Sequence, residues 1–527
     1  MASLFLGIDV GTSGTKALLV DRQGRVRATA TAAHPSSFPR LGWSEQRPED
    51  WWRSTCAATT RVLRQARAAG GDVAGVGLSG QMHGSVFLDA RQRVLRPALL
   101  WNDQRTTVEC EEIERRAGGR AALIGLVNNV ALTGYTAPKI LWLRRNEPKL
   151  FAQLRTVLLP KDYVNLRLTG ERSAEVSDAS GTLLFDVARR SWSRELIRRL
   201  DLDPALFPPA VESSAVIGAI AAAAARSTGL KAGTPVVGGA GDQAAAAVGT
   251  GVVRRGIVSA TLGTSGVVFA HSAVPVPNEA GLLQSFCHAV PGAWCVFGCM
   301  LAAGGSLQWA REVLYADRLA RARTDAQRDA IYTAMIADAA ASEPDETLVF
   351  HPYLTGERCP YPHPHARAAF SGLTRSHGRG ALVRAVLEGI TLGMGRQMEI
   401  MRTLGVPIHE VRLAGGGARN ARWRQLQADV YGVRCASMRS EEGSALGAAL
   451  LAAVGAGAFK SVPEACTAAA KVRATYQPVA TQTRHYRQLA ERMRATYETL
   501  EPWYRPAAPQ RRQRMELRRT RHNMTAD

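Results

Sequence analysis

The chain has 527 residues, 46% of them hydrophobic and 21% charged, with a formal net charge of +21. It is too long for one hydrophobic core and its composition excludes a largely disordered protein, so we expect two or more domains. The excess arginine is scattered along the chain and ends in a basic, disordered tail predicted at 505–527, a pattern that argues against a specific nucleic-acid site.

Cysteine usage and the first residues predict a cytoplasmic protein without membrane attachment. None of the eight cysteines belongs to a CxxC pair, and Cys295 and Cys299 lack a second pair at zinc-ribbon spacing, which favours reduced, mostly buried thiols. The N-terminus has no basic start and carries Asp9 within its short apolar run, so it does not resemble a secretion signal. The weakly polar stretch 445–459 is shorter than the ~20 residues needed to cross a bilayer. We expect a close-packed helix there.

The first predicted element is a strand, a glycine turn and a second strand. Residues 4–9 alternate as a strand does, the sequence GTSG follows at 11–14, and a second strand is predicted over 16–20. The same pattern returns near the middle of the chain, where a strand over 257–262 precedes a second GTSG at 263–266. This repeat indicates an internal duplication.

Further strands alternate with helices along the rest of the chain. The predicted elements are strands at 73–79, 234–238 and 411–415, and helices at 311–341, 381–399 and 423–429. Such alternation predicts an α/β fold with mixed or parallel sheets. We place a first domain at 1–250, a second at 251–480 and a closing helix at 481–504.

Both GTSG turns are candidate phosphate sites. Glycine lets the backbone NH groups approach an anion closely, and the neighbouring hydroxyls add donors. One such turn alone is better explained as a tight hairpin, but two copies at the heads of two domains favour a bound polyphosphate. The residues concerned are Gly11, Thr12 and Ser13 in the first turn and Gly263, Thr264 and Ser265 in the second.

Two aspartates and a third glycine cluster complete a candidate phosphoryl-transfer site. Asp242 stands at a predicted strand end and is our candidate general base, although an aspartate there could simply cap a helix. Asp9 could hold Mg²⁺ through water, or could cap the hairpin. The glycines at 415–417 lie between a strand and a helix, where a nucleotide could pass.

The loop at 79–85 is a candidate sugar site. It places Gln81 and His83 between glycines after a strand, although a single histidine is more often structural. Gly75, Gly77 and Gly80 match GxGxxG, but loop and strand follow, so we reject dinucleotide binding. The chain also lacks a GxxxxGK[ST] P-loop and the HRD and DFG motifs of protein kinases.

Three histidines fall in the proline-rich stretch 351–367, which predicts an irregular loop. They are His351, His363 and His365. No carboxylate or thiol set accompanies them at metal-binding spacing, so we do not predict a dedicated metal site there.

Taken in order, these motifs resemble those of the FGGY carbohydrate kinases along almost the whole chain. They include GIDVGTSGTK (7–16), GQMHG (80–84), WNDQR (101–105), KDY (161–163), SDASG (177–181), GGAGDQ (238–243), LGTSG (262–266), YLTGER (353–358), AGGGARN (414–420) and EGSALGAAL (442–450). GQMHG and WNDQR resemble the members that phosphorylate D-xylulose more than those that act on glycerol or gluconate. The resemblance implies two actin-like, ribonuclease H-like domains around a central cleft, with the sugar mainly on the first and ATP mainly on the second.

The resemblance also implies residue roles. Asp242 would be the base and Asp9 would support Mg²⁺ and the phosphates. The sugar would contact Met82 and His83, with Gln81, Trp101, Asp103 and Gln243 beside them, while Gly263, Thr264 and Ser265 would lie near the phosphates and Gly416, Gly417 and Asn420 near the nucleoside. The expected reaction converts ATP and D-xylulose into ADP and D-xylulose 5-phosphate.

The chain departs from the family pattern in ways that bear on the substrate. Gln243 stands where asparagine is common, and Cys359 and His363 replace the residues usual before two prolines. The alternatives are a kinase for another sugar such as ribulose or a pentitol, a non-catalytic sugar-responsive regulator, and an actin-like ATPase. The sequence leaves a homodimer open, and we expect the segment 506–527 to be dispensable for activity.

Overall fold

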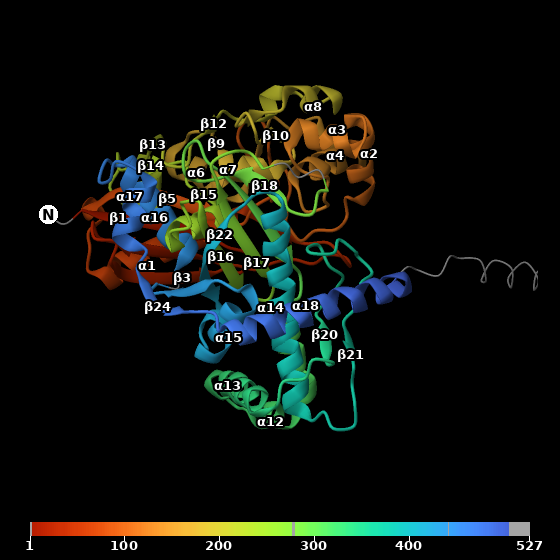
Figure 1. Ribbon diagram of the computed structural model, residues 1–527. Coiled ribbons are helices and arrows are strands. Elements are labelled where there is room, and N and C mark those ends of the chain that lie inside the picture. Colours follow the sequence, from red (N-terminus) through yellow and green to blue (C-terminus); the bar gives the residue numbers. More distant parts are fainter. Residues whose placement is uncertain (1–2, 277–279, 441, 505–527) are drawn as a thin grey trace, which may run out of the picture.

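The computed structural model describes residues 3–276, 280–440 and 442–504, where the chain forms two mixed seven-stranded sheets (Figure 1). The tail predicted at 505–527 lies outside these residues. The first sheet has the order β13-β14-β5-β1-β2-β3, with β15 also paired to β5. Its strands are β1 (Leu4–Val10), β2 (Gly14–Val20), β3 (Val26–Ala33), β5 (Val73–Gly80), β13 (Val216–Ala219), β14 (Pro235–Val237) and β15 (Ala240–Gly241).

The second sheet repeats the beginning of the first. Its order is β18-β19-β17-β16-β22-β23-β24, and an antiparallel hairpin again lies beside parallel strands. Its strands are β16 (Gly256–Leu262), β17 (Gly266–Ser272), β18 (Gln284–Cys287), β19 (Trp294–Met300), β22 (Ile408–Gly415), β23 (Arg434–Met438) and β24 (Val472–Tyr476). Each GTSG joins the first two strands of its sheet, as predicted. The α/β class with two domains on mixed sheets is therefore confirmed, while the boundaries near 250 and 480 stay predictions.

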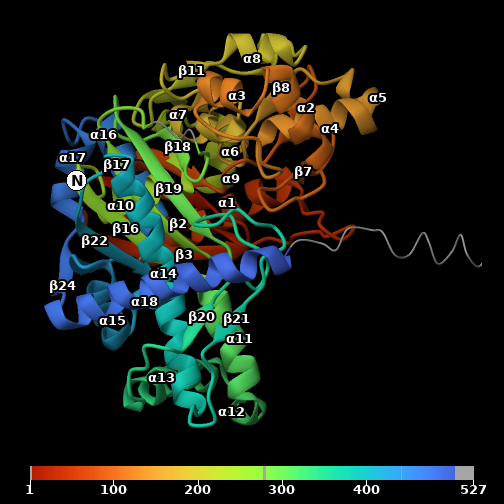
Figure 2. The ribbon, with the colours of Figure 1, turned by 45° about the vertical axis from the view of Figure 1, so that its right-hand side comes forward.

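Helices flank both sheets. In the first half they are α1 (Pro48–Ala66), α2 (Thr107–Ala117), α3 (Arg120–Val127), α4 (Thr136–Asn146), α5 (Pro148–Phe151), α6 (Pro160–Thr169), α7 (Val176–Ala179), α8 (Arg194–Arg199), α9 (Ala222–Thr228) and α10 (Asp242–Thr250). In the second half they are α11 (Gly304–Leu314), α12 (Ala316–Arg321), α13 (Asp325–Ala341), α14 (Arg379–Thr403), α15 (Ala421–Tyr431), α16 (Gly443–Gly455), α17 (Val462–Ala469) and α18 (Ala480–Leu500). Figures 1 and 2 place α2–α4 and α8 at one end of the molecule and α12 and α13 at the other.

Short two-stranded ladders connect these elements. They pair β4 (Glu45–Gln46) with β7 (Ala98–Leu99), β6 (Val86–Leu88) with β8 (Thr156–Leu158), β9 (Ala174–Glu175) with β12 (Ala210–Val211), β10 (Phe185–Asp186) with β11 (Ser191–Trp192), and β20 (Val349–His351) with β21 (Ala369–Ser371). The loop after Gly80 leads into β6 and not into a helix, so the predicted loop and strand are confirmed. A dinucleotide-binding motif would need a helix there.

Helix α16 ties the two halves together, because it belongs to the second half in sequence but packs on the first sheet and on α10. Small residues make this approach possible. A Cβ on Gly7 of β1 would lie 1.9 Å from the Ala445 carbonyl oxygen, and one on Gly447 would lie 1.8 Å from that of Ala245. The Ala- and Gly-rich stretch is thus a close-packed helix, although it ends at Gly455 and residues 456–459 lie beyond it.

Two further predictions concern cysteines and membranes. All eight cysteines are free thiols, and five of them are buried, as expected. No helix in residues 3–276, 280–440 and 442–504 combines the length and the apolar character needed to cross a membrane.

Candidate active site

Three parallel strand ends bring the two predicted aspartates together. In the register of the sheet, Asp9 of β1 and Ala240 of β15 both pair with Ser79 of β5, and Asp242 follows β15 directly. The Asp9 Oδ1 atom accepts a hydrogen bond of 2.5 Å from the Ser79 hydroxyl. Because side-chain chemistry gathers at the carboxyl ends of parallel strands in such sheets, this edge is the natural place for a site.

The electrostatics of the two carboxylates are coupled. Burial raises the pKa of Asp9, which the Ser79 hydrogen bond and the charge of Lys16 partly offset. The pKa of Asp242 is raised to about 7, first by burial and then by the negative charge of Asp9. Hydrogen bonds from Gln243 act in the opposite direction and lower it. A carboxylate with a pKa near neutrality is suited to accept a proton during catalysis.

Asp242 is the first residue of helix α10, and the capping position belongs to Gly241. The alternative interpretation, in which Asp242 serves only as the helix cap, is therefore wrong, because Gly241 occupies the capping position. Gly241 is fixed from two sides: its NH donates to the Ser177 hydroxyl at 3.1 Å, and a Cβ placed on it would fall 2.8 Å from Met82. Met82 thus packs directly beside the candidate base, and Gln243 is the half-buried next residue of the helix.

His83 is held in a defined neutral form. Its backbone is left-handed, with φ of 69°, and its Nδ1 donates to the Gly181 carbonyl at 2.7 Å. Burial lowers the pKa of His83 to about 3. A neutral imidazole that donates through Nδ1 keeps Nε2 as an acceptor, which suits it to a sugar hydroxyl.

The structure adds three neighbours of His83 that the sequence analysis did not select. The Tyr135 ring lies 4.9 Å from the imidazole and the Phe286 ring 6.0 Å from it, centroid to centroid. The charge of Arg358, from the second half, also lowers the pKa of His83. Arg358 belongs to the YLTGER motif, which was a signal that could have drawn attention to it.

The first GTSG turn is braced by residues predicted to touch the sugar. Thr12 Oγ1 donates to Gln81 Oε1 at 3.3 Å and accepts from the Trp101 indole NH at 3.1 Å. Gln81 in turn donates to Gln46 Oε1 at 2.8 Å. Gln81 and Trp101 therefore support the turn at Gly11, Thr12 and Ser13.

Asp103 is not brought into this group. It is fully buried, and its carboxylate accepts from the Ser44 NH at 2.7 Å and pairs with the Arg105 guanidinium at 2.7 Å. A carboxylate with these partners positions the loop, and its contact with the sugar stays a prediction.

The second GTSG turn and the third glycine cluster line one cavity of about 460 Å³. The cavity brings together Gly263, Thr264, Gly416, Gly417 and Asn420, all predicted to face the nucleotide, with Gly304, Gln308, Tyr332 and Trp423 among the additional lining residues. Ser265 is not among them. Helix α11 begins against the turn, since the NH groups of Gly304 and Gly305 donate to the carbonyls of Gly263 and Thr264 at 2.9 and 3.0 Å.

Asn420 begins the helix on the other side of this cavity. Its Oδ1 accepts from the backbone NH of Arg422 at 2.9 Å and caps α15. The cavity therefore sits between two helix starts, where backbone NH groups and the helix dipoles favour an anionic ligand.

None of the three histidines of the stretch 351–367 lines the nucleotide cavity in the described part of the chain, although Arg358 of the same stretch lies near His83. The expectation of an irregular loop is wrong at its start, because His351 ends strand β20, where its Nε2 lies 2.9 Å from Thr496 Oγ1. Burial lowers its pKa to about 4. Within the described residues no group of three or more His, Cys, Asp and Glu is placed to hold a metal ion.

Comparisons with known proteins match both halves of the chain to one family. Residues 4–249 match the N-terminal domain of the FGGY family of carbohydrate kinases, and residues 258–456 match its C-terminal domain. The chain is 41% identical over 462 residues to the xylulose kinase of Escherichia coli, which covers 88% of this chain and 92% of that one. It is 35% identical to the xylulose kinase of Bacillus subtilis, in a match that covers 93% of this chain and 96% of that one. The crystal structure of the xylulose kinase of Rhodospirillum rubrum superposes with a TM-score of 0.86 at 31% identity, over 95% of this chain and 99% of that one.

Proposed function

Since this chain belongs to the FGGY family of carbohydrate kinases, we propose that it transfers the γ-phosphate of ATP to a hydroxyl of D-xylulose with Asp242 as the general base. Its fold is the actin-like fold of these sugar kinases. The observation that carries the proposal is Asp242 beside Asp9 at the end of three parallel strands, with a pKa raised to about 7.

Each half of the site has a distinct task in this reaction. The sugar lies against Met82 and the neutral His83, whose Nε2 accepts a hydrogen bond from a hydroxyl. The nucleoside occupies the cavity lined by Gly416, Gly417 and Asn420. The two GTSG turns present backbone NH groups and hydroxyls to the phosphates.

The chemical step is an in-line displacement. Asp242 accepts the proton as the sugar oxygen forms its bond to the γ-phosphorus, while the bond from that phosphorus to the oxygen bridging to the β-phosphate breaks and releases ADP. Water must be excluded, since it would otherwise accept the phosphoryl group.

Asp9 is the residue that would hold the Mg²⁺ that accompanies ATP, through water. Its Oδ2 makes no hydrogen bond within the described residues, whereas Oδ1 is fixed by Ser79. One carboxylate with a free oxygen fits Mg²⁺, which keeps several waters and takes few protein ligands. Bound there, the ion would neutralise charge developing on the phosphates.

The compartment we propose is the cytoplasm, because eight unpaired thiols are typical of a reducing environment. The small-molecule partner is the ketose, and a homodimer remains a prediction.

The function is tested by measuring ADP production with MgATP and a panel of pentuloses, hexuloses and polyols. Activity that is highest on D-xylulose supports the proposal. Activity confined to ribulose or a pentitol would keep the reaction and change the substrate. Absence of sugar-dependent turnover in protein that still binds ATP would favour a regulator, and sugar-independent ATP hydrolysis would favour an actin-like ATPase.

The pH profile should report the titration of Asp242. Only the carboxylate can accept a proton, so kcat/KM for the sugar should fall about tenfold per pH unit below a midpoint of about 7, the value to which burial and Asp9 raise the pKa of Asp242. The measurement is initial velocity between pH 5.5 and 8.5 at saturating MgATP, with stability checked at each pH. A rate that stays flat down to about pH 5.5 would contradict this assignment.

Asn420→Ala should weaken nucleotide binding. It removes the cap of α15, at a cost of about 1 kcal/mol, and opens one wall of the nucleotide cavity. We expect KM for ATP to rise about fivefold to tenfold with KM for the sugar unchanged. Ser461→Ala is the matched control, because Ser461 caps the distant helix α17 by accepting from the Glu464 NH. Equal changes in the two variants would show that Asn420 has no role beyond capping.

A further inference from the structure

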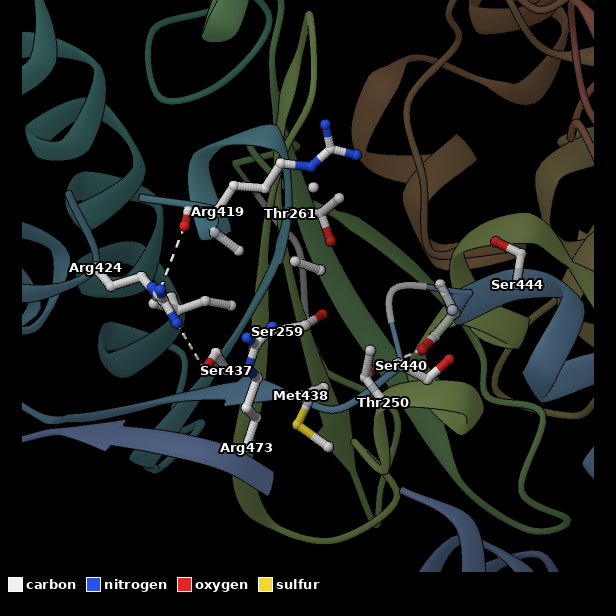
Figure 3. A pocket seen from close by; sticks show the side chains of 16 residues that line it. Thr250, Ser259, Thr261, Arg419, Arg424, Ser437, Met438, Ser440, Ser444 and Arg473 are labelled. Carbon is white, nitrogen blue, oxygen red and sulfur yellow. Dashed lines mark hydrogen bonds between the residues drawn. The ribbon is translucent and has the colours of Figure 1, made fainter. Parts of the chain in front are cut away.

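A second cavity, of about 280 Å³ (Figure 3), adjoins the nucleotide cavity, with which it shares Arg419 as a lining residue. Successive residues of a strand point to opposite faces, and Leu262 of β16 lines the nucleotide cavity while Ser259 and Thr261 line this one. The other walls come from α10, β22, β23, β24 and the starts of α15 and α16. We call it the arginine cavity.

The arginine cavity is strongly cationic and rich in hydroxyl groups. Among the described residues, the sixteen that line it include no aspartate or glutamate. Those with polar side chains are Arg419, Arg424, Arg473, Thr250, Ser259, Thr261, Ser437, Ser440 and Ser444. The described lining residues therefore offer many donors and carry no negative charge.

Among the described residues, Arg424 is held in place by neutral partners and by no acidic one. Its Nη1 donates to the Ser437 hydroxyl at 3.0 Å and its Nη2 to the Arg419 carbonyl at 3.3 Å, while its guanidinium lies over the Tyr476 ring at 5.1 Å. Its buried Nε has no hydrogen-bond partner in the part of the chain that the structure describes. A guanidinium fixed by neutral groups retains its full charge for a ligand.

Arg473 approaches from β24. Figure 3 shows its guanidinium, like that of Arg424, turned toward the region of Ser259 and Ser437, whereas that of Arg419 points elsewhere. Within residues 3–276, 280–440 and 442–504, Arg473 makes no ion pair. Two converging positive charges repel each other, and a bound anion would remove that repulsion.

We propose that the arginine cavity binds a phosphate dianion, either inorganic phosphate or the phosphate group of a small phosphorylated metabolite. Planar guanidinium groups match the oxygens of phosphate, and the hydroxyls of Ser259 and Ser437 add donors to the remaining oxygens. The volume holds roughly nine water molecules, which is enough for a phosphate with a small organic group attached. The solvent-exposed side chain of Arg473 marks the open side of the cavity.

The site is distinct from the γ-phosphate position but mechanically linked to it. Ser444, which lines the arginine cavity, donates its hydroxyl to the backbone carbonyl of Asp242 at 3.1 Å. Ala246 and Thr250 of α10, the helix that Asp242 begins, line it as well. The bound anion would therefore lie in a cavity that is also lined by the two helices that meet behind the catalytic edge.

The test is calorimetric titration of inorganic phosphate and, separately, of ribose 5-phosphate. Each is titrated into the full chain saturated with D-xylulose and the non-hydrolysable ATP analogue AMP-PNP with Mg²⁺, which fills the sugar and nucleotide sites. Phosphate is also titrated into the protein alone, so that this arm does not depend on the proposed function. Ionic strength is held constant with chloride. Tighter binding of ribose 5-phosphate would identify a phosphorylated metabolite, and equal binding would identify free phosphate.

Arg473→Gln and Arg424→Gln should each weaken binding about tenfold or more, as expected for the loss of a charge-assisted hydrogen bond. Arg64→Gln, at an exposed arginine of α1, makes the same charge change and should bind as the wild type does. All variants must still bind AMP-PNP, which shows that they are folded. Absence of binding to the wild type, equal binding by all variants, or complete displacement of phosphate by AMP-PNP would overturn the proposal.

Discussion

Replacing Asp242 by asparagine should lower kcat by about 10²- to 10⁴-fold while leaving KM for ATP within about twofold. The substitution keeps the shape of the side chain but removes the group that accepts the proton. Because the amide cannot accept that proton at any pH, the loss of rate below pH 7 should disappear together with most of the activity. The measurement is ADP release at saturating MgATP and D-xylulose, with thermal unfolding to confirm the fold.

Asp325→Asn is the matched control, because it removes an acidic side chain from the start of a helix without removing a candidate base. Asp325 is also the first residue of its helix, α13, but it is exposed, and among the described residues its one ion pair is with Arg328. The favourable interaction of either aspartate with its helix dipole is worth about 0.3–1 kcal/mol, far less than the expected catalytic loss. Activity above about a tenth of the wild-type value in Asp242→Asn would transfer the role of base to another group, such as Asp9, whose charge acts on Asp242.

The parts of this molecule that the sequence predicted are those set by local rules. The alternation in 4–9 and 257–262 and the glycine turns that follow specify two hairpins, because a strand and its turn are encoded in a few adjacent residues. The repeated GTSG then indicated two related sheets. Asp242 could be selected for a similar reason, since it directly follows a short strand between those hairpins.

The parts that sequence could not supply depend on contacts between distant segments. Nothing near Asp103 in the sequence shows that the backbone NH of Ser44, 59 residues earlier, donates to its carboxylate. The contact of Asp103 with the sugar stays a prediction. Tyr135 and Phe286 meet around His83 from positions about 150 residues apart. The pKa of Asp242 likewise depends on burial and on Asp9, which only the folded sheet brings near.

The three departures from the family pattern are not equivalent in the structure. Gln243 lies next to the candidate base and hydrogen bonds to it, so it can influence both the sugar and the proton transfer. Cys359 is instead buried in the hydrophobic core of the second half. The backbone of His363 exchanges two hydrogen bonds of 3.0 Å with the backbone of Glu357. His363 therefore helps to set the conformation of the loop between them. Substrate preference is therefore best tested first at Gln243.

A buried ionic cluster behind the catalytic edge supports the second large prediction. Lys161 is fully buried, and its Nζ lies 2.5 Å from Asp162 Oδ1 and 3.4 Å from Asp178 Oδ2. Its partners' charges, together with that of Glu175, raise the pKa of Lys161 despite its burial. Glu175 accepts from the Ser177 hydroxyl at 2.7 Å, and Ser177 in turn holds the NH of Gly241, next to Asp242. The cluster therefore anchors the backbone that presents the candidate base.

Lys161→Met should destabilise the protein by about 3–5 kcal/mol, because it leaves buried carboxylates without a cation. For a domain of this size we expect a fall in Tm of roughly 10 °C, together with a lower kcat as the Gly241 segment loosens. Lys231→Met removes an exposed lysine and should change neither quantity. Adding Asp178→Asn to Lys161→Met removes one uncompensated carboxylate and should restore part of the stability. A Tm within about 1 °C of the wild type in Lys161→Met would show that the carboxyl groups are already protonated, and that Lys161 neither stabilises the cluster nor positions Asp242 through it.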